Sequence, residues 1–156
     1  MFRHLFAQDR AVSNGLAQID TYLQRIGSEA RLNEDHRALI TQDNAFIQIC
    51  AFPDHNLVAF RAFINYLPLE DSERLHALYF HLLDLSDNPE TGLAYFCIMD
   101  GKEVGMAQNV IGVEVKHTIS DLGYNEFTAS LQAVEEVASR HAGRIADAYG
   151  APRITG

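Results

Sequence analysis

The sequence predicts an α+β domain in which helices pack on an antiparallel sheet, with the element order α-β-β-β-α-β-β-α. Apolar residues recur every three or four positions near both ends of the chain and in its middle, and apolar runs of strand length lie next to one another. An Asp-Gly pair separates two of these runs, as in a hairpin. Adjacent strands separated by single helices favour an antiparallel sheet with helices on it.

The first helix is expected over residues 13–26. Ser13 or Asn14 can cap its start, and Gly27 follows where a left-handed C-terminal cap is common. Three upstream apolar residues predict only a short additional turn, so residues 1–12 are treated as an N-terminal extension. The apolar stripe of the helix consists of Val12, Leu16, Ile19, Leu23 and Ile26.

Three strands are expected next, over residues 38–41, 45–52 and 57–66. Pro53 to Asn56 has the composition of a turn, and the third strand ends before Pro68. Short connections between successive strands predict an antiparallel meander.

A second helix is expected from Ser72, as its cap, to about Leu85, and Asn88-Pro89 closes that segment. A hairpin follows, with strands over residues 93–99 and 104–115 around the Asp100-Gly101 turn.

The last helix is the clearest element of the pattern, and Gly150 ends it. Its apolar positions recur every three or four residues, while Glu136 and Arg140 form an i,i+4 pair on the opposite face. A single domain is therefore expected over residues 13–150, followed by a C-terminal tail over residues 151–156. The stripe consists of Phe127, Leu131, Val134, Ala138, His141, Ile145 and Tyr149.

Composition and charge restrict the partners. The 156 residues suit one domain, and 47% of them are hydrophobic. The net charge of −9 disfavours nucleic acid and anionic lipid, which attract Lys and Arg. No apolar stretch approaches the ~18 residues of a membrane span. Cys50 and Cys97 lie in strand-like runs as isolated thiols, which indicates a reducing, cytoplasmic location, although their pairing is not excluded.

No motif for catalysis, metal binding or cofactor binding is found. His76 and His81 are five residues apart, which does not place two ligands on one helical face. Cys97 could pair with His117 or His141 for nucleophilic catalysis, but a buried structural thiol is the better interpretation. We therefore predict a protein without catalytic residues, metal or cofactor.

The second helix is apolar over a wider arc than one sheet contact needs. Its apolar positions span about 220°, against roughly 100° or somewhat more for a single buried face. Either the last helix covers the remainder, or a second copy of the chain does, since twofold dimers are the commonest assembly. The candidate dimer residues are Leu75, Leu78, Tyr79, Phe80 and Leu82.

The strands are apolar on both faces, unlike a half-solvated antiparallel sheet. Either helices cover both faces, or one face is a docking surface. Candidate contacts for a bound protein are Leu16, Ile19 and Leu23 of the first helix and Leu57, Ala59 and Phe63 of the third strand; the alternative is that they are core residues.

Over residues 13–150 the chain resembles the class I type III secretion chaperones of the Tir-chaperone (CesT-like) family. The resemblance rests on Tyr22 to Gly27 at the end of the first helix, on Tyr66-Leu67-Pro68 and on Leu82-Leu83 leading to Asn88. It also rests on the long final helix after the Asp100-Gly101 hairpin. YbjN-like proteins share the layout.

The resemblance implies a cytoplasmic homodimer that holds the N-terminal segment of a secreted effector in an extended, export-competent state. It implies a dimer contact through the second helix, no cofactor and no membrane insertion. Such binding adds a strand to a sheet edge and fills apolar pockets. Two alternatives remain: a YbjN-like regulatory adaptor, and a small-ligand-binding domain or enzyme that uses the sheet as a pocket floor.

Overall fold

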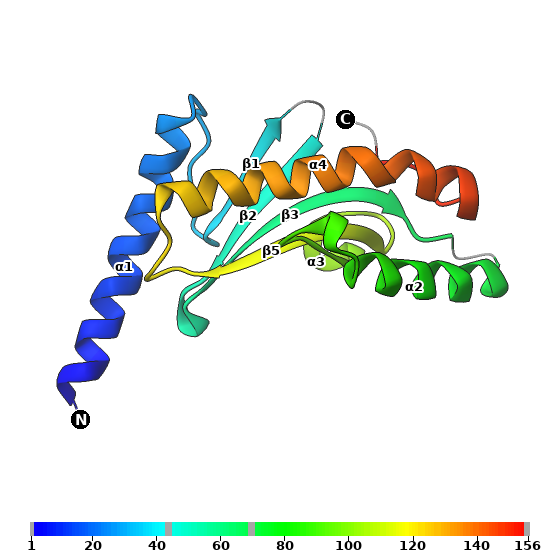
Figure 1. Ribbon diagram of the computed structural model, residues 1–156. Coiled ribbons are helices and arrows are strands. Elements are labelled where there is room, and N and C mark those ends of the chain that lie inside the picture. The colour runs from blue at the N-terminus through cyan, green and yellow to red at the C-terminus, as the bar shows by residue number, and fades with distance from the viewer. Residues whose placement is uncertain (1, 43–44, 69–70, 155–156) are drawn as a thin grey trace.

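The computed structural model describes residues 2–42, 45–68 and 71–154 and forms one five-stranded antiparallel sheet with helices packed on it (Figure 1). The strand order is β1-β2-β3-β5-β4, so β1 and β4 are the two edges. The strands are β1 (Arg37–Gln42), β2 (Ala45–Phe52), β3 (Leu57–Tyr66), β4 (Tyr95–Met99) and β5 (Val110–Thr118). The helices are α1 (Phe2–Arg25), α2 (Ser72–Ser86), α3 (Gly101–Val104) and α4 (Tyr124–Tyr149), with short 3-10 turns at Pro53–His55 and Pro89–Thr91.

One face of the sheet carries the hydrophobic core. Alternate residues of the strands face α1, α4 and the inner side of α2, and they form one cluster with those helices. The Phe60 ring of β3 packs edge-on against Phe127 of α4, with the ring centroids 5.5 Å apart. Burying each large apolar side chain of this kind contributes about 1.5–3 kcal/mol.

The predicted fold class and meander are confirmed. β2 and β3 have the predicted bounds, and β1 is one residue longer at each end than the predicted strand. β1 pairs antiparallel with β2, and β2 with β3. Gly150 ends α4 as predicted, in the left-handed conformation with a φ of 65°.

The predicted start of the first helix is wrong. α1 begins at Phe2 instead of Ser13, and both Ser13 and Asn14 are exposed residues within it. Nothing between Phe2 and Val12 breaks a helix, so the helix continues upstream of a plausible cap. In Figure 1 the N-terminal part of α1 extends beyond the sheet. The division into an extension, a domain and a tail stays a prediction.

The predicted two-residue turn at Asp100-Gly101 is also wrong. The Asp100 carboxylate accepts a hydrogen bond from the Lys102 N–H (2.9 Å), so it caps α3, which ends at Gly105 with a φ of 75°. β5 therefore starts at Val110 instead of Val104, and Met99 pairs with Val110. An aspartate suits a helix N-cap as well as a tight turn, which is why the pattern was ambiguous.

Similarly, α2 is capped by Asp71, whose side chain accepts from two N–H groups of the first turn, and Ser72 is the first helical residue.

Candidate protein-binding surfaces

The free edge of β1 is the first candidate surface. At its start the edge is occupied by Asn33. The Asn33 side-chain oxygen accepts a hydrogen bond from the Arg37 N–H, and the Asn33 N–H donates one to the Arg37 carbonyl (2.9 Å each). Inward and outward main-chain groups alternate along an antiparallel edge strand. The N–H and C=O groups of Leu39 and Thr41 therefore point away from β2, and the Leu39 side chain is 56% exposed. Such an edge is a template for another strand.

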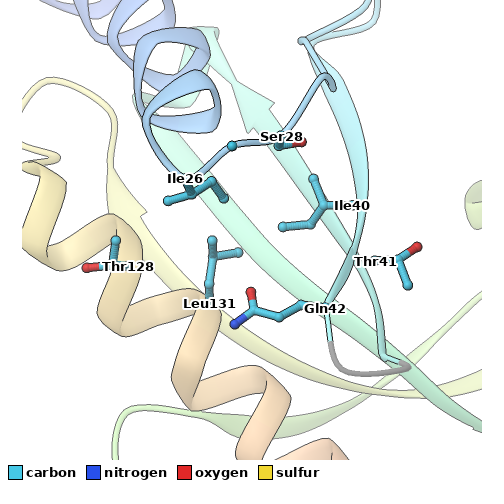
Figure 2. A pocket seen from close by; sticks show the side chains of 8 residues that line it. Ile26, Ser28, Ile40, Thr41, Gln42, Thr128 and Leu131 are labelled. Carbon is cyan, nitrogen blue, oxygen red and sulfur yellow. The ribbon is translucent and has the colours of Figure 1, made fainter.

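A cavity of about 330 Å³ lies beside this edge on the helix-covered face of the sheet. Figure 2 shows Ile26 at the end of α1, Ile40 of β1 and Leu131 of α4 turned toward the same space, with the Gln42 amide beside them. The wall thus combines apolar and polar groups in nearly equal share. Its lining residues also include Gly27, Ser28, Thr41 and Thr128.

A second cavity, of about 440 Å³, lies on the opposite face of the sheet next to the same edge. Leu39 of β1, Phe46 of β2 and Phe63 of β3 form its floor, and Met106 of the α3 segment lies on its side. Arg37 donates a hydrogen bond to the Glu103 carbonyl (3.1 Å), which holds the α3 segment close to β1. The remaining lining residues are Gln48, Tyr66, Val104, Gly105 and Ile154.

The two cavities match the geometry of an added strand. Successive residues of a strand point to opposite faces of a sheet. On β1 this alternation places Ile40 in one cavity and Leu39 in the other. A polypeptide paired with β1 would direct its own alternate side chains toward the same two cavities.

The outer surface of α2 is the second candidate. The predicted dimer residues divide there: Leu78 and Leu82 are buried in the core of the single chain, and Leu75 is partly buried. Tyr79 and Phe80 point outward, and Phe80 is 76% exposed. Leu83 (70% exposed), which we did not predict, lies on this outer side, and Leu93 and Ile98 are further exposed apolar side chains.

The wide apolar arc therefore has two sides. Its inner side contacts β4 and α4, as one of the two explanations requires. Its outer side remains exposed in the single chain, and the dimer contact stays a prediction.

The predicted contacts for a bound protein also divide. Ile19, Leu23 and Ala59 have no exposed surface, so they belong to the core of the single chain. Leu16 lies beside a cavity near the Pro53–Asn56 turn, and Leu57 is half-buried. Phe63 alone of the six lines a cavity beside β1. We missed Ile26, Leu39, Ile40 and Phe46, although alternation in the first strand of the meander was a signal for two of them.

A buried polar cluster occupies the centre of the face opposite α4. The Glu114 carboxylate of β5 accepts hydrogen bonds from the Tyr95 hydroxyl (2.6 Å), the Lys116 ammonium (2.9 Å) and the Arg61 guanidinium. Burial acts to raise the pKa of Glu114, but these hydrogen bonds outweigh it and hold the pKa below its usual value. The carboxylate is thus ionised and fully bonded, which suits a structural role.

The thiol of Cys97 is also unsuited to catalysis. Burial, followed by the nearby Glu114 charge, raises the pKa of Cys97 to about 12, so the thiol is protonated near neutral pH. His117 and His141 contact Phe60 and Phe96 on the helix-covered face, whereas Cys97 lies on the other face. Cys50 and Cys97 are both free thiols.

Residues 2–42, 45–68 and 71–154 contain neither a candidate metal site nor a candidate membrane-spanning helix. In these ranges no group of three or more His, Cys, Asp or Glu side chains is arranged to hold a metal ion. None of the helices there combines the length and the apolar character needed to cross a membrane.

No protein-family model matches the sequence, and no curated protein is significantly similar to it. Solved structures do match. A chain of the ExsC–ExsE complex has a TM-score of 0.65 at 12% identity, over 86% of this chain and 95% of that chain. YbjN from E. coli has a TM-score of 0.61 at 12% identity, over 90% and 96% of the two chains.

A structure of the Yersinia pestis type III secretion chaperone SycH with a fragment of YscM2 has a TM-score of 0.55 at 14% identity, over 83% of this chain and 98% of that chain. At such identities the similarity establishes the fold. The fold is that of type III secretion chaperones and of YbjN, as the resemblance in the sequence predicts.

Proposed function

We propose that this protein is a cytoplasmic chaperone that holds the N-terminal segment of a secreted effector in an extended state before export. The observation that carries the proposal is the edge of β1, which no other described strand covers, between two cavities, one on each face of the sheet. The cavity on the face opposite α4 is mainly apolar, and the other combines apolar and polar groups. This arrangement suits an extended polypeptide with apolar residues at alternate positions. The similarity in fold to SycH, a type III secretion chaperone, supports it further.

The energetics favour a long segment over a short one. Two apolar side chains in the cavities contribute about 1.5–3 kcal/mol each. Each main-chain hydrogen bond adds about 0.5–1.5 kcal/mol. Ordering each backbone residue costs about 1–2 kcal/mol, so a four-residue strand on β1 alone is close to balance. Firm binding therefore needs contacts beyond this edge, as in a segment that wraps around the chaperone.

The outer surface of α2 supports a homodimer as part of the proposal. Tyr79, Phe80 and Leu83 form a contiguous apolar surface on one helix. Exposed apolar patches of soluble proteins are characteristic of interaction sites. A twofold dimer would present two β1 edges to one client, and linked weak sites bind a long segment more tightly than one site does.

A binding role is proposed in preference to an enzymatic one. Among the described residues Glu114 is the most buried carboxylate, and its three donors saturate it. The cavities beside β1 lie open at a sheet edge, and the one on the face opposite α4 is mainly apolar. A regulatory adaptor is the second candidate, favoured by the similarity in fold to YbjN.

The test is co-expression of the chain with tagged N-terminal segments of secreted proteins from its host, followed by co-purification. Leu39→Pro removes an outward N–H, which an edge strand tolerates, and we expect it to lower recovery of the chain with the segment. Leu39→Val keeps the N–H and is the matched control, which should bind. If both variants are folded and bind equally, β1 is not the docking edge. If no secreted segment co-purifies with the wild-type chain, and a pull-down of the tagged chain from its host recovers only non-secreted regulators, the adaptor is the better function.

A further inference from the structure

The C-terminal segment, residues 151–154, joins the sheet through an isolated antiparallel β-bridge to the end of β3. After Gly150 the chain reverses direction and runs antiparallel beside the end of β3, with Arg153 opposite Asn65. The Tyr66 N–H donates to the Pro152 carbonyl (2.8 Å), and the Ile154 N–H donates to the Ile64 carbonyl (2.9 Å). Residues 151–154 therefore occupy a sheet edge in the way that a bound peptide does.

This edge exists because β2 separates from β3 before β3 ends. The pairing of β2 with β3 starts at Ile47 and Ala62. The two preceding residues of β2, Ala45 and Phe46, pair only with β1. The last part of β3 thus lacks β2 as a neighbour on the side away from β5. Residues 151–154 fill this gap, which we call the β3 gap.

The segment is anchored at its start and loosely held beyond it. Ala151 is fully buried, and its carbonyl accepts a hydrogen bond from the Asn65 amide (2.8 Å), which also donates to the Ala142 carbonyl (3.0 Å). Beyond Ala151, the side chains of Pro152 and Arg153 are exposed and Ile154 is half-buried. Local opening is easiest where few apolar contacts are buried. The part that can leave the sheet therefore begins after Ala151.

Ile154 connects the β3 gap to the cavity beside β1. It lines the 440 Å³ cavity together with Leu39 and Phe46. It also lines a smaller cavity of about 170 Å³, between Phe63 of β3 and Ala142 of α4. Moving Ile154 away would enlarge the 440 Å³ cavity. A strand added to β1 would direct half of its side chains toward this cavity.

We propose that residues 152–154 are a built-in strand that an extended partner segment displaces from the β3 gap. The partner is an extended polypeptide with an aliphatic side chain at the place of Ile154. A basic residue beside it, as in Pro152-Arg153-Ile154, suits a chain of net charge −9. That the partner is an extended polypeptide rests on the proposed function. The inference adds the β3 gap as a second docking edge, for which residues 152–154 compete with the partner.

The test uses a fluorescent peptide of residues 149–156 of this chain and measures its binding by fluorescence anisotropy. A tethered strand competes at an effective concentration in roughly the millimolar range. The wild-type chain should therefore bind the peptide at least about tenfold more weakly than a chain truncated after Ala151.

Two proline variants make the test specific. Ile154→Pro removes the N–H that donates to Ile64, so this variant should bind the peptide as the truncated chain does. Arg153→Pro is the matched control, because the hydrogen bonds across the gap come from residues 152 and 154. It should bind as weakly as the wild-type chain.

Three outcomes would overturn the proposal. In the first, the truncated chain is folded but binds the peptide no better than the wild-type chain. In the second, the two proline variants bind alike. In the third, truncation and Ile154→Pro both abolish the thermal unfolding transition, which would make the segment an essential part of the fold. The probe is a piece of this chain, so failure here leaves the Leu39 test of the proposed function unaffected.

Discussion

At the scale of single residues, two of the buried polar side chains are Glu114 of β5 and His141 of α4, whose surroundings the strand pattern does not reveal. Glu114 and Arg61 are cross-strand neighbours of β5 and β3, and Tyr95 of β4 lies opposite Glu114 on the other side. The alternation of the strands predicts which face these residues share, but their pairing depends on strand order. The sequence therefore suggested two apolar faces where one face has a charged centre.

Replacing Glu114 tests this centre. Glu114→Gln leaves the Arg61 guanidinium without its carboxylate partner, and breaking a buried ion pair costs about 3 kcal/mol or more. We expect the free energy of unfolding, measured by urea denaturation at pH 7, to fall by about 3 kcal/mol. Glu136→Gln, at an exposed position of α4, is the control and should change it by less than about 0.5 kcal/mol.

The loss of stability in Glu114→Gln should depend on pH, and the shifted pKa of Glu114 gives the direction. The pKa of Glu114 is lowered in the folded chain, so its stabilisation is complete above the ordinary value of 4.5 and is lost as pH falls below it toward the folded value. The difference between the wild-type chain and Glu114→Gln should therefore shrink below pH 4.5. An unchanged difference at low pH would mean that the carboxylate charge contributes nothing.

His141 is the second buried polar group. Its Nε2 atom has no hydrogen-bond partner, and its ring packs edge-on against Phe96. Burial lowers the pKa of His141, helped by Arg144 and Arg140 of α4 and His81 of α2, while Glu90 acts in the opposite direction. The folded chain thus takes up this proton less readily than the unfolded chain, so stability falls as pH drops below 6.5 toward the lower folded value.

The measurement is the free energy of unfolding of the wild-type chain and of two variants at pH 7 and at pH 5. His141→Gln should lose less stability between these pH values than the wild-type chain. His55→Gln, at an exposed position, should lose as much as the wild-type chain. Equal losses for all three proteins would show that His141 does not titrate with a shifted pKa.

At the scale of elements, local patterns predicted β2, β3 and the end of α4 because alternation and a glycine cap are local properties. Two of the wrong boundaries involve residues with two roles. Asp100 suits both a turn and a helix cap, and Ser13 suits both a cap and an exposed helical position. The proposed docking edge could not be located from sequence, because it depends on β1 being outermost in the sheet.

α2 provides the prediction at this scale. Phe80→Asp changes a side chain that is 76% exposed, so the free energy of unfolding of the single chain should change by less than about 0.5 kcal/mol. If α2 forms the dimer contact, sedimentation should show the mass falling to that of one chain. Leu39→Asp, at an exposed leucine of the opposite edge, is the control and should leave the mass unchanged.

A folded Phe80→Asp variant with the mass of the wild-type assembly would place the contact elsewhere. A wild-type chain that is itself a monomer would remove the dimer from the proposed function.

At the scale of the whole molecule, helices cover one face of the sheet. The edges of the sheet differ in how far other segments of the chain cover them. The β4 edge is partly covered, because the Ser86 hydroxyl at the end of α2 accepts a hydrogen bond from the Phe96 N–H (2.9 Å). The β3 gap is filled by residues 151–154. Within the described residues, no main-chain hydrogen bond covers the β1 edge at Leu39 and Thr41, and cavities lie on both of its sides. This edge is therefore the candidate for strand addition in the proposed function.

Amide hydrogen exchange, resolved by residue, on the complex with a bound effector segment is the most direct test of strand addition at β1. The N–H groups of Leu39 and Thr41 should exchange much more slowly in the complex than in the free chain, because they become paired with the client. The N–H of Ile40, already paired with β2, should change little. A tight complex in which Leu39 and Thr41 exchange as fast as in the free chain would contradict strand addition at β1.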